Sequence, residues 1–245
     1  MPSQVLNVKV DWSKAAAEYL NEKIAVIDDF FSEEALAELW RYSLEAPHFR
    51  TVRAGYLGAF PADGNTHPIV LQAAIALEQR MPAVFAGHPL GLWWFFKYPS
   101  APKGINIHAD QAAVNVNIWL TPDEEREEGG GLHVYMQLPP DEGGIWEHNR
   151  ERTAEDEAAL RTLLQGGPVQ KVPYRRNRAV MFISELYHES ESALFKDPSE
   201  RPRVNLTLLF GDRRQIPTGQ TKRVSSTTLD ALKVEAAEDW GLFDA

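Results

Sequence analysis

The feature that most constrains the fold is a change in hydrophobic periodicity near residue 91. Before it, apolar residues recur at helical spacing over residues 33–45, and a second helix is predicted over residues 68–81. After it, the pattern changes to period two, most clearly over residues 114–120, where every second residue is apolar. A chain that places helices first and a run of short strands after them is expected to form an α+β domain whose core is a β-sandwich or barrel.

The remaining segments complete this outline. One helix is predicted to interrupt the strands over residues 153–165, where Thr153 can cap the helix and two glycines follow it. The acidic residues 123–128 are predicted to form a solvated loop, and a short helix is predicted near residues 229–238. Further strands are predicted over residues 24–31, 92–98, 132–138, 169–172, 179–183 and 204–210.

No segment reads as a linker that would divide the chain. We therefore expect one domain over residues 1–245. Its parts would be a leading strand with support helices (1–90), a strand-rich core with the helical insertion (91–212) and a C-terminal extension (213–245).

Composition excludes several classes of function. The chain has 25 Lys and Arg against 35 Asp and Glu, a net charge of −10, which argues against nucleic acid as the main partner. It has no cysteine, so disulfides, zinc–thiolate sites, iron–sulfur clusters and cysteine nucleophiles are excluded. The longest apolar stretch, near residues 92–96, is far shorter than the roughly 20 residues that cross a bilayer. With no signal peptide recognisable, we expect a cytoplasmic protein without a membrane partner.

The most informative polar constellation is His108-Ala109-Asp110 together with the distant His188. In an extended segment, residues i and i+2 project to the same side, so His108 and Asp110 can point into one pocket. A second imidazole from His188 would complete a three-ligand facial site with open positions, as expected of non-heme Fe(II) oxygenases. The tripeptide alone is weak support, because a loop histidine bonded to a nearby carboxylate is the ordinary alternative.

A second constellation lies on the strand that follows His188. Arg203, Asn205 and Thr207 share one face of that strand by period two. An arginine among apolar neighbours needs a carboxylate partner, because an unpaired buried charge costs several kcal/mol, roughly, after relaxation. A dicarboxylic cosubstrate would supply that partner. Arg201 is the alternative clamp, although Pro202 places it at the strand edge and only Arg203 keeps the alternation.

Taken together, these motifs resemble the Fe(II)- and 2-oxoglutarate-dependent oxygenases, and most closely the prolyl-hydroxylase-like branch of that superfamily. The resemblance implies a double-stranded β-helix, a jelly-roll or cupin-like barrel, with N-terminal support helices and one helical insertion. It covers close to half of the chain. The matching segments are Tyr98-Pro99, His108-Ala109-Asp110, residues 116–120, Gly130-Gly131-Leu132, residues 179–182, His188-Glu189 and residues 203–210.

The resemblance also implies roles for individual residues. His108, Asp110 and His188 would hold Fe(II). Arg203 would bind the distal carboxylate of 2-oxoglutarate, with Thr207 as a neighbouring hydrogen-bond donor and Tyr98 donating its hydroxyl to the same cosubstrate. On the preceding strand, Asn115, Asn117 and Trp119 would line the cosubstrate or substrate site if their face points inward.

The implied activity is hydroxylation of an unactivated C–H bond, with release of succinate and CO2. The partners would be 2-oxoglutarate, O2 and an organic substrate that the sequence does not identify, whether a small molecule or a peptide or protein side chain. Oligomeric state is not predicted. Two alternatives stay open: a cupin-type metal enzyme that does not use 2-oxoglutarate, and an inactive barrel that serves as a binding module. A cupin-type enzyme would not need Arg203 and Thr207, and the intact set of metal ligands argues against an inactive barrel.

Three other groups of residues are predicted to have structural rather than functional roles. His133 is predicted to be a structural strand histidine, and most of residues 93–96 to pack in the core, with one or two walling the substrate pocket. The basic cluster Lys171, Arg175, Arg176 and Arg178 is predicted to be a solvated turn, with recognition of an acidic substrate as the alternative.

Overall fold

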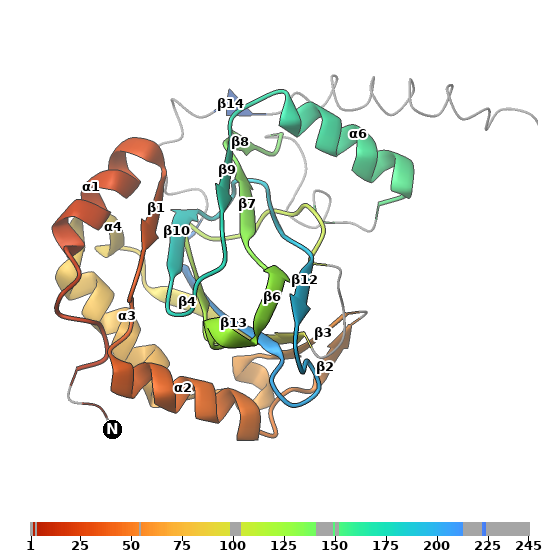
Figure 1. Ribbon diagram of the computed structural model, residues 1–245. Coiled ribbons are helices and arrows are strands. Elements are labelled where there is room, and N and C mark those ends of the chain that lie inside the picture. The colour runs from red at the N-terminus through yellow and green to blue at the C-terminus, as the bar shows by residue number, and fades with distance from the viewer. Residues whose placement is uncertain are drawn as a thin grey trace, which may run out of the picture.

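A seven-stranded antiparallel sheet forms the centre of the fold (Figure 1). The computed structural model describes residues 2, 4–53, 55–98, 104–140, 149, 152–212 and 222–223. The strand order is β1 (Ile24–Ile27), β10 (Ala179–Ile183), β5 (Val114–Trp119), β13 (Arg203–Phe210), β4 (Leu90–Tyr98), β3 (Tyr56–Ala59) and β2 (Thr51–Arg53).

Within the ranges that the structure describes, three smaller sheets accompany the large one. The first is three-stranded, in the order β11 (His188–Ser190), β7 (Leu132–Tyr135) and β9 (Val169–Val172). The second pairs β12 (Ala193–Phe195) with β6 (Arg126–Gly129), and the third pairs β14 (Lys222–Arg223) with β8 (Gln137–Leu138). A backbone bridge between His108 and His188 ties β11 to the segment that leads into β5, so the three-stranded sheet is fastened to the large one.

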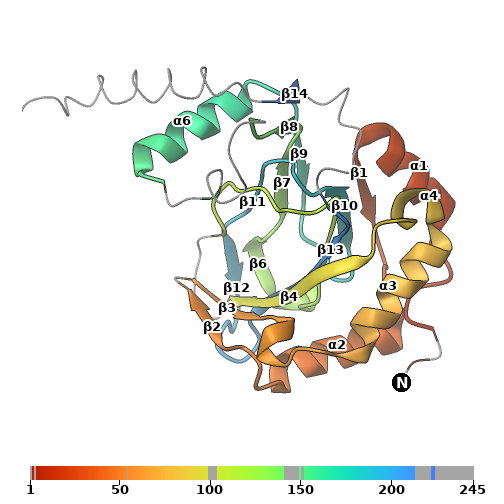
Figure 2. The ribbon, with the colours of Figure 1, turned by 180° about the vertical axis from the view of Figure 1, so that it is seen from behind.

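The helices divide between two sides of the molecule (Figures 1 and 2). Four lie together beside the large sheet: α1 (Trp12–Glu22), α2 (Glu33–Glu45), α3 (Pro68–Arg80) and α4 (Pro82–Phe85). Their buried side chains share one apolar core with the face of the sheet that carries Phe95 and Leu206. The remaining α-helix of the described residues, α6 (Ala154–Gln165), lies on the opposite side, near β8 and β9. Short 3-10 turns occur at η1 (Pro61–Asp63) and η2 (Asp123–Glu125).

Most of the predicted elements are confirmed. The helices predicted over residues 33–45 and 153–165 are α2 and α6, and their expected caps, Ser32 and Thr153, accept hydrogen bonds from the helix backbone. The helix predicted over residues 68–81 ends at Arg80. The strands predicted near 92–98, 114–120, 169–172, 179–183 and 204–210 are present, and 132–138 divides into β7 and β8. The architecture, helices with antiparallel sheets, agrees with the α+β class.

Several expectations are wrong. The strand predicted over residues 24–31 ends at Ile27, because Asp29 takes a left-handed backbone conformation with φ of 54°. The acidic residues 123–128 are mostly exposed, as predicted, but they are not a loop: residues 126–129 form β6, and Glu125 is buried. Helix α1 has no counterpart in the prediction, because two of its four buried residues are alanines, which give a weak hydrophobic pattern. The helix predicted near residues 229–238 lies outside the described residues. No described helix combines the length and apolar character needed to cross a membrane.

Candidate metal centre

His108, Asp110 and His188 converge where the three-stranded sheet meets the seven-stranded sheet, the two main sheets of the fold. One ligand atom of each lies within 4.8 Å of the others, and His188 Nε2 is 3.5 Å from Asp110 Oδ2. The two imidazole rings have centroids 4.2 Å apart. The backbones of His108 and His188 exchange two hydrogen bonds, of 2.9 and 2.8 Å, so main-chain pairing brings together segments 80 residues apart in the sequence.

Backbone contacts select the same ring nitrogen in both histidines. His108 Nδ1 is 2.8 Å from the carbonyl oxygen of Asn106, and His188 Nδ1 is 2.8 Å from that of Leu186. A carbonyl oxygen can only accept, so each Nδ1 carries the proton and donates it. The lone pair is therefore on Nε2 in both rings, which is the form that binds a metal ion.

The carboxylate of Asp110 is oriented by the large sheet. Asn115, on β5, donates from Nδ2 to Asp110 Oδ2 at 2.9 Å. The backbone amide of Asp110 donates to the carbonyl oxygen of Ser184, just beyond β10, at 3.0 Å. Asn115 was predicted to line the site but its contact with the carboxylate was not foreseen, since it depends on how the 108–113 segment folds back.

Electrostatics keep these groups in their metal-binding forms. Burial lowers the pKa of His108 to about 4, and the nearby His188 adds to the effect, so His108 is neutral at pH 7. Burial alone would raise the pKa of Asp110, but the nearby imidazoles of His188 and His108 and the hydrogen bond from Asn115 outweigh it. The pKa of Asp110 is therefore lowered, and its carboxyl group is ionised.

Arg203, at the start of β13, is a buried cation with no carboxylate partner among the described residues. Its side chain donates to the carbonyl oxygen of Gly130 from Nε (3.2 Å) and Nη2 (3.0 Å), and from Nη1 to Asn205 Oδ1 at 3.4 Å. Its guanidinium carbon lies 4.6 Å from the centre of the Tyr98 ring. None of these partners carries a compensating charge.

Arg201 lies in a different environment. Its side chain is 60% exposed and forms an ion pair with Glu125, whereas only 3% of Arg203 is exposed. The sequence left both arginines open as the residue that binds a carboxylate. Of the two, only Arg203 is buried and has no carboxylate partner among the described residues.

Strand register places the other predicted cosubstrate residues on the same sheet face as Arg203. Directly paired residues of antiparallel strands project to the same side. Thr207 pairs with Asn117, and its Oγ1 accepts from Asn117 Nδ2 at 3.1 Å and from Asn205 Nδ2 at 3.2 Å. The register pairs are Arg203 with Tyr98, Asn205 with Phe96 and Trp119, Thr207 with Trp94 and Asn117, and Leu209 with Asn115.

This face retains unused hydrogen-bonding capacity. The Tyr98 hydroxyl, Asn117 Oδ1 and Trp119 Nε1 are buried and have no hydrogen-bond partner within the described part of the chain. The Tyr98 hydroxyl lies near Arg203 and Ser190 but meets neither with hydrogen-bonding geometry, and burial raises its pKa. Buried polar atoms normally form hydrogen bonds. A cluster of buried polar atoms without partners, beside a guanidinium that no carboxylate neutralises, therefore indicates a binding site for a polar ligand.

An aromatic cluster continues this face towards the sheet edge. The Tyr56 and Phe96 rings have centroids 4.4 Å apart, and the Trp94 ring stacks on Phe96 at 5.5 Å. Phe60 contacts both Trp94 and Phe96. The prediction that most of residues 93–96 pack in the core holds for Phe95 and for Trp93, which packs against the main core, while Trp94 and Phe96 are buried in a separate cluster on this face.

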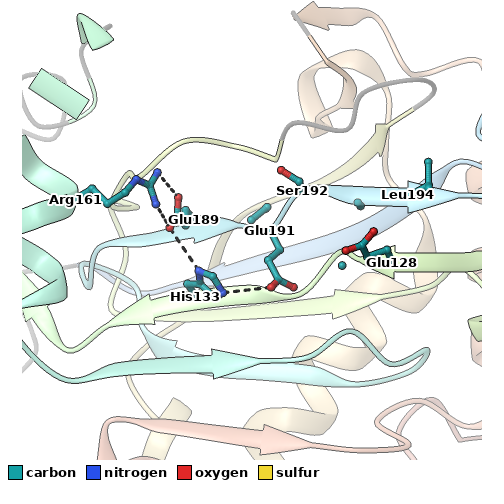
Figure 3. A pocket seen from close by; sticks show the side chains of 10 residues that line it. Glu128, His133, Arg161, Glu189, Glu191, Ser192 and Leu194 are labelled. Atoms are coloured by element: carbon teal, nitrogen blue, oxygen red, sulfur yellow. Dashed lines mark hydrogen bonds and ion pairs between the residues drawn. The ribbon is translucent and has the colours of Figure 1, made fainter. Parts of the chain in front are cut away.

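Other candidate residues have structural contacts. His133 lies on β7 between Glu189 and Glu191, with a ring nitrogen 3.5 Å from a carboxylate oxygen of each (Figure 3). It is a strand histidine, as predicted. Arg175 and Arg178, from the basic turn, both pair with Asp28, so much of that cluster's charge is neutralised within the chain.

The Gly130 carbonyl is a contact that the sequence did not indicate. Gly129 and Gly130 adopt φ of 63° and 86°, conformations that glycine takes readily, and this turn aims the Gly130 oxygen at Arg203. The sequence signal was the Gly130-Gly131-Leu132 segment, which belongs to the family resemblance but did not indicate this contact.

No model of a known protein family matches the chain, and no curated protein matches it either. Solved structures do resemble it in fold. The non-heme α-ketoglutarate-dependent carbocyclase SnoK is 16% identical, with a TM-score of 0.55 over 86% of this chain and 87% of that one. A prolyl 4-hydroxylase from Pseudomonas putida is 16% identical, with a TM-score of 0.53 over 87% and 97%.

A third structure, HygX from Streptomyces hygroscopicus with nickel, 2-oxoglutarate and hygromycin B bound, is 15% identical, with a TM-score of 0.51 over 81% of this chain and 86% of that one. These identities support likeness of fold. The resemblance to 2-oxoglutarate–Fe(II) oxygenases, prolyl 4-hydroxylases among them, is thus confirmed at the level of the fold.

Proposed function

We propose that this protein is an Fe(II)- and 2-oxoglutarate-dependent oxygenase. The observation that carries the proposal is the buried Arg203, which has no carboxylate partner among the described residues and shares a sheet face with the residue that orients Asp110. We further propose that the two main sheets form a double-stranded β-helix. In this proposal, residues 1–245 are one domain, with the support helices in 1–90, the core in 91–212 and an extension in 213–245.

The donor set fits Fe(II). Nε2 of His108, Nε2 of His188 and a carboxylate oxygen of Asp110 would be the ligands, two neutral imidazoles and one anion, which suits a facial site with open positions. Asn115 would hold the carboxylate in its ligating orientation. With Fe(II) and 2-oxoglutarate bound, the centre would couple reduction of O2 to oxidative decarboxylation, yielding succinate and CO2, and to oxidation of a C–H bond.

Arg203 would bind the distal carboxylate of 2-oxoglutarate. A bidentate pair would neutralise the buried guanidinium, and the Tyr98 hydroxyl could donate to the same carboxylate. Thr207 and Asn117 lie further along the same face, towards Asn115 and the triad. Since Asn115 and Trp119 are four strand positions apart, about 13 Å of sheet separates the two ends of this face.

The primary substrate is proposed to be a small molecule or a peptide or protein side chain that is hydroxylated at an unactivated carbon. Tyr56, Phe60, Trp94 and Phe96 would form an apolar wall beside the cosubstrate. Such a wall favours a substrate that presents an apolar or planar part to the centre.

The test is an anaerobic titration of the metal-free protein with Fe(II) and 2-oxoglutarate. We expect a weak visible charge-transfer band only when both are present. The band should disappear in Asp110→Ala and weaken in Arg203→Met, while the surface variant Arg201→Met should match wild type. Exposure to O2 should then release succinate.

Two results would contradict the proposal. Metal binding by the triad without the band would favour a cupin-type enzyme that does not use 2-oxoglutarate. No metal binding at all would leave the barrel as a binding module.

A further inference from the structure

Helix α6, the insertion between β8 and β9, packs behind both segments that carry the candidate metal-binding histidines. We propose that α6 is a positioning element for the metal centre, and that Arg161 is its principal positioning residue. The proposal rests on the metal site proposed above. It assigns to the insertion a role that the order of the elements along the chain does not reveal.

The apolar contacts of α6 are to the residues that flank the two histidines. Ile107, Ala109 and Tyr187 are buried in one small cluster with Leu160 and Leu164 of the helix. In extended backbone, neighbours of a residue project to the opposite side. The histidines therefore turn towards the metal centre while the residues beside them pack on α6.

The N-terminal part of α6 holds the backbone next to His108. Glu157 Oε1 accepts from the Ile107 amide at 3.2 Å. Arg152, just before the helix, donates from Nη1 to the Ile107 carbonyl oxygen at 2.6 Å and to Glu157 Oε2 at 3.2 Å. The Glu157–Arg152 pair thus forms hydrogen bonds with both the amide and the carbonyl group of the Ile107 backbone.

The middle of α6 holds the strand that carries His188. Arg161 makes a two-pronged ion pair with Glu189, with Nη1–Oε1 at 2.5 Å and Nη2–Oε2 at 2.7 Å (Figure 3). The Tyr135 hydroxyl, on β7, also donates to Glu189 Oε1 at 2.5 Å. Burial opposes ionisation of Glu189, but the bonds from His133, Arg161 and Tyr135 outweigh it and lower its pKa to about 2.

These contacts act on the backbone bridge that sets the distance between the two histidines. His108 and His188 exchange their amide hydrogen bonds with each other, and α6 contacts the residue directly beside each of them. A metal site works only when its ligands are held to within about 0.5 Å. Loosening α6 should therefore widen the bridge without disturbing the large sheet.

The test compares Arg161→Gln and Arg161→Lys with Thr162→Ala. Thr162 is the neighbouring helix residue and is exposed, and its hydroxyl bonds, within the described part of the chain, only to the carbonyl oxygen of Ala158 on its own helix, so it is a matched control. The first measurement is amide hydrogen exchange of the metal-free protein, at His108 and His188 and at the reference positions Val116 and Leu206 of the large sheet. The second is the affinity for Co(II), followed by its visible absorption.

In Arg161→Gln we expect exchange at His108 and His188 to quicken at least tenfold, with less than a twofold change at Val116 and Leu206. Co(II) binding should weaken about tenfold, the lower end of what loss of outer-shell support costs a metal site. Arg161→Lys keeps the positive charge but cannot form the two-pronged pair with Glu189. It should therefore show smaller changes in both exchange and Co(II) affinity than Arg161→Gln. Thr162→Ala should change neither.

Equal acceleration at all four amides would mean that Arg161 contributes only general stability, and would overturn the inference. Unchanged exchange or unchanged Co(II) affinity in Arg161→Gln would also overturn it. If wild type binds Co(II) but shows no chemistry with 2-oxoglutarate, the oxygenase proposal fails and the positioning role stands. If wild type takes up no Co(II), both proposals fail.

Discussion

Replacing Arg203 with methionine removes a buried charge while keeping much of the side-chain volume. Only 3% of Arg203 is exposed, and no described carboxylate pairs with it. Keeping an ion in such a place costs several kcal/mol, roughly 4 after relaxation. The substitution gives up the bonds to Gly130 and the contact with the Tyr98 ring, together about 3 kcal/mol. The free energy of unfolding of the ligand-free protein should therefore rise by about 1 kcal/mol.

The same substitution should greatly weaken 2-oxoglutarate binding. Loss of a buried charge pair costs about 3 kcal/mol, which corresponds to roughly 150-fold in Kd. At a cosubstrate concentration about 100 times the wild-type Kd, wild type gains about 2.7 kcal/mol of stability. The variant should gain only about 0.3 kcal/mol under the same conditions. Stability without the ligand and stabilisation by the ligand are thus expected to move in opposite directions.

Urea unfolding measures both quantities. The ligand-free arm is run with a chelator, and the ligand arm is run with Mn(II), without O2, with and without 2-oxoglutarate. Arg201→Met is the control, because that side chain is 60% exposed and its surface pair should be worth no more than about 1 kcal/mol. A loss of more than about 2 kcal/mol in ligand-free Arg203→Met would refute the reasoning about an unpaired charge. If 2-oxoglutarate stabilises Arg203→Met as much as wild type, Arg203 does not bind its carboxylate.

Three further predictions concern single contacts. Asn115→Ala should weaken Fe(II) or Co(II) binding about tenfold, because Asp110 loses the hydrogen bond that orients its carboxylate. A metal titration measures this, and an unchanged Kd would show that the carboxylate needs no such support. Gly129→Ala should lower the free energy of unfolding, measured in urea, by about 2 kcal/mol or more. A Cβ at this position would overlap the Ser192 carbonyl oxygen, and the positive φ is unfavourable for alanine. A variant as stable as wild type would contradict this. Asp28→Asn should destabilise the protein by about 1 kcal/mol at pH 7, because the hydrogen bond from Arg178 lowers the pKa of the carboxyl group. A lowered pKa gives stability that is present above the unfolded-state pKa and lost as the pH falls from there through the folded-state pKa, so the difference between Asp28→Asn and wild type should shrink between about pH 5 and pH 3. A difference independent of pH would contradict this.

Local sequence patterns determined most of the secondary structure. Helices α2 and α6 follow from apolar spacing and from the caps Ser32 and Thr153, and strand β5 follows from strict alternation. These signals act between residues no more than about four positions apart, so they can be recognised without knowing the fold. Where the pattern was weak, as in the alanine-rich α1, or where acidic residues form a paired strand, as in β6, prediction failed.

The candidate site was only partly accessible to the same reasoning. The spacing of His108 and Asp110 and the alternation of Arg203, Asn205 and Thr207 indicated which side chains share a face. The partners of those side chains were not indicated. The ion pair of Arg201 with Glu125, the Gly130 carbonyl beside Arg203 and the bond from Asn115 to Asp110 are all consequences of folding.

The sequence by itself determined which residue types could hold a metal ion and a dicarboxylate, and on which elements they lie. Only the tertiary structure decided that Asn115 orients Asp110, that the Gly130 carbonyl lies beside Arg203, and that α6 lies behind the metal-binding segments. The physical reason is register. A shift of one residue turns every side chain of a strand to its other face, and pairing between segments 80 residues apart is set by the packing of the whole chain.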